Sequence, residues 1–241
     1  MSKQPANNTR VFLDEFDFSG ELTGINLRLT QETPVSAGFS STGPRRVVGN
    51  YDHEHSFLGM FEGDDDGYDE QIHAILGDAG DHYLTQTFGA AVEGDVAYDA
   101  VVTVNEQPRS ALIAGVVLLN FNAVGTGRIT RGVILGSKTS TGAEDLTGQN
   151  TGTTTVTVDT YTVVFRVLAF TGTNITITVE QSSDNGSGDA YAAVSGLTSG
   201  ALTAIGVVQA STVAATEAWK RVAISGTYSS ALILVTAGVA S

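Results

Sequence analysis

The sequence predicts a mainly β protein, a sandwich or barrel of antiparallel strands with one short flanking helix and long loops. Three observations predict it. The 241 residues include 30 Thr and 26 Val, and β-branched side chains fit a pleated sheet better than a helix. The chain also holds 28 Gly, many of them in turn-like clusters between apolar runs. Apolar and polar residues alternate with period two in several segments, which is typical of half-buried strands.

The alternation is clearest in two segments. In residues 20–30, Ile25, Leu27 and Leu29 alternate with polar side chains, and residues 173–179 repeat the pattern with Ile and Val. Each segment follows a short Phe-containing turn, so the chain is either internally duplicated or built from two similar Thr-rich sheets. Both segments are predicted to be strands with one packed and one solvated face.

Two other runs, Ala111–Phe121 and Tyr161–Phe170, are apolar at odd and even positions alike. Both faces of such a strand must be covered. A central strand of the core would satisfy this, and so would a strand whose second face meets a neighbouring subunit. The pattern leaves both alternatives open.

Turn and helix signals are sparse but specific. The pair Asn185-Gly186 suits the positive φ angles of a hairpin turn. The segment Asp69–Leu76 is the one persuasive helix, because Ile72 and Ile75 share a face, Asp69 can cap the start and Gly77 can end it.

Two polar segments interrupt these elements. Residues 137–155 are rich in Gly and Thr without apolar periodicity, and residues 31–46 contain two Pro and two Gly. Both are predicted to be long loops. The expected organisation is therefore an acidic β region over residues 1–136, a loop or junction over 137–155, and a Thr- and Val-rich β region over 156–241, which completes the sandwich or forms a second β unit.

The net charge of −14 is concentrated in the first half of the chain. Residues 1–110 hold 19 acidic and 6 basic residues, and residues 111–241 hold 7 and 6. From Val47 through Pro108 there are 14 Asp and Glu and no Lys or Arg. Such a field repels phosphate backbones, so tight binding of nucleic acid is not expected. There is no cysteine, no apolar signal segment at the start, and no apolar run of about 18 residues that would span a membrane.

The acidic stretch Gly59–His73 has the composition of a metal-binding or acid–base site, but its residues do not match the pattern that such a site requires. As a calcium loop it would begin at Glu62, where Asp is usual, and end at His73, where a bidentate carboxylate is required. The four histidines lack zinc-ligand spacing, and His53 and His55 would share a packed strand face while Asp52 and Glu54 point the other way. Signatures of nucleotide, phosphate and nucleophile sites are absent. The sequence predicts no catalytic residue, cofactor or metal, and hence no enzyme.

Two parts of the sequence resemble a known family. The run VFLDEFDFSGELTGINLRLTQETPVSAGFSSTGPRRVVGNYDHEHSFLGMFEG resembles the opening of major tail proteins of long, non-contractile-tailed phages. The runs TVVFRVLAFTGTNITITVEQSSDN and AWKRVAISGTYSSALILVTA are similar to the second half of some of these proteins. The resemblance covers most of the chain and rests on strand, loop and turn patterns. The Thr- and Gly-rich second half is longer than a minimal tube subunit requires.

The resemblance implies a tail-tube type of β-sandwich or barrel whose subunits form stacked rings in the virion after assembly in the host cytoplasm. Rings would be hexameric, or trimeric if the chain is duplicated, and DNA would pass without tight binding. Implied partners are copies of the chain and the tape measure, tail terminator and distal tail proteins, with no membrane. The candidate acidic lumen residues are Asp52, Glu54, Glu62, Asp64, Asp65 and Asp66, and the candidate inter-subunit loop residues are Pro34, Phe39, Arg45 and Arg46.

Two other classes remain as alternatives. A capsid decoration protein, or another β-rich virion part, would form closed oligomers that bind assembled shells without stacking. A carbohydrate-binding sandwich would need an exposed aromatic platform, yet Trp219 is the one Trp and lies beside Lys220 and Arg221 at the start of a strand.

Overall fold

The computed structural model describes residues 9–33, 35–36, 45–46, 51–60, 68–111, 117–152 and 160–240. The chain forms two compact units that interleave along the sequence. Unit 1 comprises residues 1–19, 82–100 and 129–241, and unit 2 comprises residues 20–81 and 101–128. The backbone therefore passes from one unit to the other four times.

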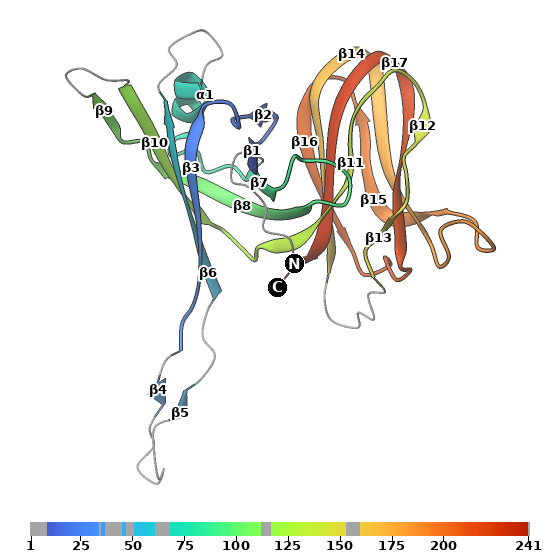
Figure 1. The fold of residues 1–241 in the computed structure, drawn as a ribbon, viewed down its shortest axis with the longest axis horizontal. Coiled ribbons are helices and arrows are strands. Elements are labelled where there is room, and N and C mark those ends of the chain that lie inside the picture. Colours follow the sequence, from blue (N-terminus) through green and yellow to red (C-terminus); the bar gives the residue numbers. More distant parts are fainter. Residues whose placement is uncertain are drawn as a thin grey trace. The chain divides into compact units, whose positions relative to one another are not determined.

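Unit 1 is built from antiparallel strands (Figure 1). Their order is β15-β14-β17-β11-β8, with β16 pairing β14, β7 pairing β8, β1 pairing β7 and β2, and β12 and β13 pairing β17. The bounds are β1 Thr9–Leu13, β2 Phe16–Asp17, β7 His82–Phe88, β8 Val96–Glu106, β11 Thr130–Ser140, β12 Glu144–Asp145, β13 Gln149–Asn150, β14 Tyr161–Ser182, β15 Ala192–Leu202, β16 Gly206–Thr212 and β17 Trp219–Ala240.

Unit 2 combines a sheet with the helix α1, and β8 contributes its last six residues to it. The sheet order is β8-β10-β6-β3, and β9 pairs with β10. The bounds are β3 Leu22–Gln31, β4 Val35–Ser36, β5 Arg45–Arg46, β6 Tyr51–Met60, α1 Tyr68–Ile75, β9 Arg109–Ala111 and β10 Val117–Gly125.

The core of unit 1 is organised by β14 and β17, which pair from Tyr161↔Val239 to Ser182↔Trp219. Every residue from Tyr161 to Val167 is buried. Alternate side chains of this run, Val163 and Phe165 among them, join the main apolar cluster, while Arg166 on the opposite face contacts β7. Residues 161–167 of the apolar run 161–170 are therefore covered on both faces within their own unit, and Ala169 is exposed.

The core of unit 2 lies between its sheet and α1. Phe57 of β6 stacks on Phe121 of β10, with ring centroids 4.2 Å apart, and Tyr68 of α1 packs on Phe121 at 5.8 Å. Ile72 is fully buried. The predicted helix 69–76 is confirmed to within one residue at each end, and Gly77, at φ 77°, follows it. Asp69 lies in the first turn of the helix, after its first residue Tyr68, and so is not at the N-cap position; its carboxylate pairs with Arg109 at 2.7 Å.

Strands β3 and β6 continue into a two-stranded extension formed by β4 and β5. Val35 pairs with Arg46 and Ser36 with Arg45. In Figure 1 this extension projects beyond the sheet of unit 2, away from α1. The predicted long connection over residues 31–46 is thus partly a β ribbon; Pro34 and Phe39 lie outside the described residues.

The segment 137–155 differs from the predicted loop. Its first four residues end β11, and β12 and β13 pair with β17, placing Glu144 opposite Ile224 and Gln149 opposite Lys220. Leu146 between them is buried. A polar segment without periodicity forms strands here because β17, at 22 residues, offers an edge to pair with. The expected boundaries at residues 136 and 155 also differ from the two interleaved units.

The predicted fold class is confirmed: the described chain is mainly β, its strands pair antiparallel, and one short helix is present. The predicted hairpin at Asn185-Gly186 is present with both residues at positive φ, 62° and 78°. The strand predicted within 20–30 is β3, although Leu29 remains 44% exposed.

Candidate assembly face of unit 2

The face of the β10–β6–β3 sheet that points away from α1, here called the outer face, is the candidate site. Along β6, His53, His55 and Phe57 are buried toward the helix side, while Asp52, Ser56 and Leu58 are exposed on the other side. This is the alternation expected from the sequence. Asp52 and Glu54 therefore lie on the outer face, as their position on the strand predicts.

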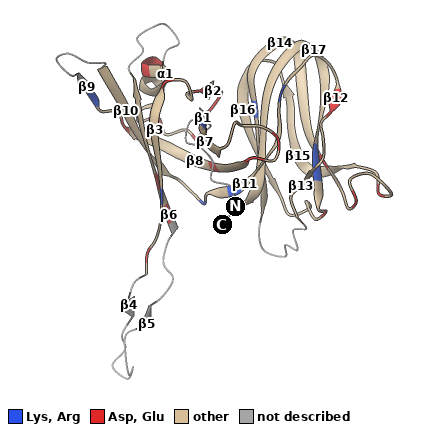
Figure 2. Cartoon of the chain, viewed as in Figure 1, with Lys and Arg blue, Asp and Glu red and all other residues tan. Residues whose placement is uncertain are grey.

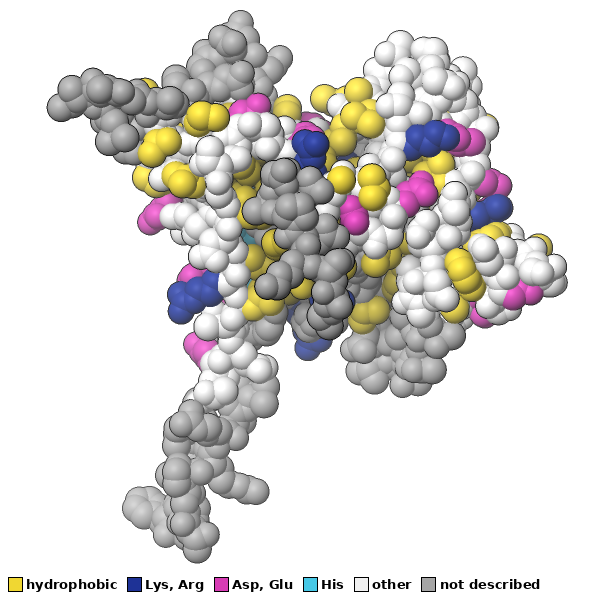
Figure 3. Space-filling view, viewed as in Figure 1, with side chains coloured by type: hydrophobic (Ala, Val, Ile, Leu, Met, Phe, Trp, Pro, Cys, Tyr) yellow, Lys and Arg dark blue, Asp and Glu magenta, His cyan; other side chains and the backbone are white. Residues whose placement is uncertain are grey.

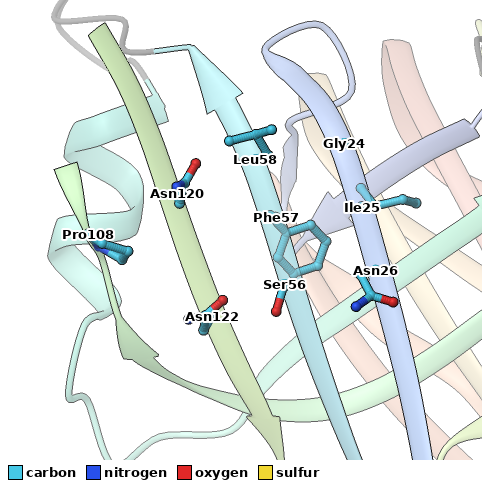
Figure 4. Close-up of a pocket in the computed structure, with 9 residues that line it drawn as sticks. All are labelled: Gly24, Ile25, Asn26, Ser56, Phe57, Leu58, Pro108, Asn120 and Asn122. Atoms are coloured by element: carbon cyan, nitrogen blue, oxygen red, sulfur yellow. The ribbon is translucent and has the colours of Figure 1, made fainter. Parts of the chain in front are cut away.

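The centre of the outer face is a row of amide and hydroxyl side chains. Asn122 of β10 lies opposite Ser56 of β6, and Ser56 lies opposite Asn26 of β3. One step along the strands, Asn120, Leu58 and Gly24 form the next row. These side chains and Gly24 line a depression of about 350 Å³, and Figure 4 shows their arrangement across the three strands. We call Asn26, Ser56, Asn120 and Asn122 the amide band.

Charges on the outer face are few and partly paired. Arg28 of β3 contacts Glu54 of β6 at 3.1 Å, and both side chains are about half exposed or more. Asn122 donates to Glu106 at 2.9 Å. The described part of this face is thus mostly uncharged, with amide and hydroxyl groups beside the exposed apolar side chains of Leu58 and Met60, and with Asp52 exposed near its end.

We expect the Arg28–Glu54 pair to contribute little to stability. Exposed ion pairs are worth about 0 to 1 kcal/mol and are screened by salt. Arg28→Gln should lower the free energy of unfolding by less than about 1 kcal/mol, measured by urea denaturation. Glu54→Gln serves as the matched control and should give a similar loss; a loss above about 2 kcal/mol for either variant would contradict this assignment.

The predicted acidic face is only partly described. Glu62, Asp64, Asp65 and Asp66 lie outside the described residues, so their exposure and direction stay predictions. Among the other acidic residues of the Lys- and Arg-free span, Asp69 and Glu70 lie on α1 and Asp99 is buried in unit 1. Figure 2 marks the acidic first turn of α1 and the basic residue on β9. On the surface seen in Figure 3, charged side chains are few among neutral ones, and some of opposite sign lie next to each other.

The histidines and carboxylates of the described residues are not arranged as a metal site. No cluster of three or more His, Asp or Glu side chains suited to a metal ion occurs among those residues. His53 and His55 contact each other at 2.9 Å, and burial lowers the pKa of both. His82 of unit 1 contacts Asp14 at 2.8 Å. His73 is exposed on α1.

The sequence reasoning missed a buried polar network in unit 1. Arg166 is fully buried and donates to the backbone oxygens of Asp14 and Tyr83 at 2.8 and 2.7 Å, and to Thr85 Oγ1. Thr85 and Thr236 both donate to Asp99 Oδ1. The signal was present, since Arg166 is the one charge in the apolar run 161–170.

Burial dominates the electrostatics of this network. It raises the pKa of the Asp99 carboxyl, against the opposing influence of Arg166 and the two hydroxyls. It lowers the pKa of Arg166 to about 10, so this guanidinium stays charged at neutral pH. Every hydrogen bond of this network lies within unit 1, so the network links strands of that unit's core.

Comparisons with known proteins give fold likenesses alone. No family model matches the sequence, and no curated protein matches it. Solved structures that match include a chain of the virion of a native gene transfer agent particle, at 15% identity and TM-score 0.42, covering 53% of this chain and 98% of that one. The SPP1 tail tube matches at 8% identity and TM-score 0.44, with 53% of this chain and 78% of that one covered.

A third solved structure is similar over most of both chains. The SPP1 Dit protein, described as a hub adsorption apparatus in phages that infect Gram-positive hosts, is 10% identical at TM-score 0.38, and 96% of this chain and 98% of that one are covered. These likenesses are too remote to assign a function. Separately, no helix in the described residues is both long and apolar enough to cross a membrane.

Proposed function

We propose that the chain is a structural, non-catalytic subunit of a phage tail that assembles with copies of itself into stacked rings forming a tube. The class of protein comes from the sequence resemblance to major tail proteins. The outer face of unit 2 would line the passage for DNA, and partners would be other tail components. Its localisation would be the virion.

The observation that carries the proposal is the free edge of β3. Among the described residues this ten-residue strand pairs with β6 alone. Unpaired strand edges are templates for pairing with another chain, and proteins that stay monomeric usually protect them. Here the protection is slight, because Arg28 is the one charged residue of β3 and Leu29 remains 44% exposed. A second copy that pairs along β3 would continue the sheet.

The chemistry of the outer face also supports a passage for DNA. Its described centre, the amide band, carries no charge, and the Arg28–Glu54 pair cancels within itself. A surface without excess Lys or Arg gives no counterion-release gain to DNA, so the polymer can move past it. Asp52 adds to the repulsion of phosphates, and Glu62 with Asp64–Asp66 would strengthen it if they lie on the same face.

Charge introduced on the β3 edge tests this proposal. Leu29→Lys should abolish rings and tubes in electron micrographs and shift the protein to monomer in analytical ultracentrifugation, because an edge lysine cannot be buried in a continuous sheet without cost. Val213→Lys is the control, since Val213 is 67% exposed and lies in unit 1. Circular dichroism should match between the two variants.

Several outcomes would contradict the proposal. A wild-type protein that stays a monodisperse monomer at high concentration would remove its basis, and so would tubes that form equally well with Leu29→Lys. Closed trimers that do not stack would instead indicate a capsid decoration protein.

A further inference from the structure

A chain of hydrogen bonds joins two buried histidines of β6 to the segment that follows β10. We call residues 125–128, which comprise the last residue of β10 and the three that follow it, the connector. His53 Nδ1 lies 2.9 Å from His55 Nε2, and His53 Nε2 lies 3.0 Å from the carbonyl oxygen of Gly127. A carbonyl can only accept, so His53 donates from Nε2. Its Nδ1, in the neutral ring, then accepts from the Nε2–H of His55.

The histidines and the connector are closely packed. His53 is 0% and His55 2% exposed, and their rings meet edge to face at 5.1 Å. His55 also stacks on Phe57, with centroids 6.3 Å apart. A Cβ added to Gly125 would lie 2.0 Å from the His53 ring. The connector has one further backbone anchor, because Thr126 N donates to Val101 O at 2.9 Å.

The surroundings favour neutral rings. Burial is the main influence on both, and it lowers the pKa of His55 to about 3, with the neighbouring His53 acting in the same direction. For His53, burial outweighs the bond to Gly127 and the charge of Asp52, which raise its pKa. β10 carries no charged residue, and Arg28 and Glu54 pair on the opposite face. The remaining charged or titratable groups of the adjoining elements are Arg128 in the connector, three residues of β8 (Tyr98, Asp99 and Glu106) and four of α1 (Tyr68, Asp69, Glu70 and His73).

We propose that the His53–His55 pair is an acid-sensitive latch that holds the connector on β6 when both rings are neutral and releases it when they are protonated. A proton added to His53 leaves its Nε2–H bond to Gly127 O in place, and that bond favours the charged ring, but it turns Nδ1 into a donor that faces the N–H of His55. The bond between the rings then survives only if His55 moves its own proton to Nδ1, and a second proton removes that arrangement. Two charged rings buried in contact then require water, which reaches the His53 ring when the connector, packed against it at Gly125, moves away. The connector leads from unit 2 into unit 1, so its release loosens one of the four chain crossings.

The expected size of the effect follows from proton linkage. In the latched state each histidine is neutral, and once released it titrates with its ordinary pKa of about 6.5. Below that pH, each such ring raises the equilibrium constant for opening about tenfold for every pH unit. Two such rings give about a hundredfold per pH unit. The opening is observable at the amide of Thr126, which is protected while its bond to Val101 holds.

Amide hydrogen exchange from pH 7.5 to 4.5, corrected for the intrinsic exchange rate, tests the latch. Thr126 protection should fall about 10- to 100-fold per pH unit below about pH 6.5, while the amide of Gly77, bonded to Val104 O at 3.2 Å, keeps its protection. In the double variant His53→Gln and His55→Gln the amides can still donate but do not titrate, so the slope should vanish. His73→Gln, on an exposed helix position, should leave it unchanged.

Thr126 protection that stays flat to pH 4.5 in the wild-type protein would overturn the latch, as would an unaltered slope in the double Gln variant. If that variant does not fold, the wild-type imidazole resonances decide. Rings of His53 and His55 that titrate near pH 6.5 while Thr126 stays protected contradict the proposal, and rings that take up protons only as Thr126 opens support it. The latch does not depend on the proposed tail function, and its test does not require assembly.

Discussion

Arg166→Leu should lower the free energy of unfolding by about 3 to 5 kcal/mol, the usual loss when one member of a buried charged network is removed. The backbone oxygens of Asp14 and Tyr83 would lose their donor, and Asp99 would stay buried without its compensating cation. Calorimetry of the purified protein measures the loss. It should appear in the transition of unit 1, which holds every member of the network.

Two further variants make the Arg166 experiment specific. Arg221→Leu removes an arginine that pairs with Asp145 and Glu180 but is 24% exposed, and it should cost less. Combining Arg166→Leu with Asp99→Leu should recover part of the loss, because apolar replacements of a complete buried ionic group are often tolerated. Equal losses for Arg166→Leu and Arg221→Leu would refute the central place given to Arg166.

Gly132→Ala should destabilise unit 1 by about 3 kcal/mol or more, which is at or above the largest loss usually measured when a core is overpacked. Gly132 of β11 lies opposite Gly238 of β17. A Cβ at position 132 would lie 1.8 Å from the carbonyl oxygen of Ala237 and 2.7 Å from Gly238 Cα. Both obstacles are backbone atoms, so no rotamer change relieves the clash. Urea denaturation gives the size of the effect.

Gly206→Ala is the matched control for Gly132→Ala. Gly206 also lies in a strand, β16, but a Cβ there meets no atom within 4 Å. The substitution should be neutral or stabilising by less than about 1 kcal/mol, through the smaller entropy of the unfolded chain. A comparable destabilisation by both variants would contradict the clash as its cause, and a neutral Gly132→Ala would show that movement of β17 relieves the clash.

Local patterns in the sequence were sufficient for some elements. The helix at 68–75 was predictable because its apolar stripe and Gly77 are all within ten residues. The two-residue period placed His53 and His55 on the buried face of β6 and Asp52 on the other. The Asn185-Gly186 turn was predictable for the same reason, since its backbone conformation depends on the two residues themselves.

Other features depend on partners far along the chain. Residues 144–145 and 149–150 become strands because β17 passes beside them, about 75 residues later in sequence. Arg166 is tolerated in a core because Tyr83, Thr85 and Asp99 are brought to it from a distance. The candidate acidic face was predicted from charge counts, which do not specify which side of a sheet each carboxylate occupies. Strand periodicity gives the side for Asp52 and Glu54, but it gives no side for Glu62 and Asp64–Asp66.

The interleaving of the two units has a consequence for synthesis on the ribosome. All of unit 2 has been made once residue 128 is added, whereas β11 must wait for β17 before Thr130 can pair with Ala240. Since domains generally fold as they emerge, we expect the smaller unit to fold while most of the larger one is still untranslated, with β11 awaiting the last strand to be made.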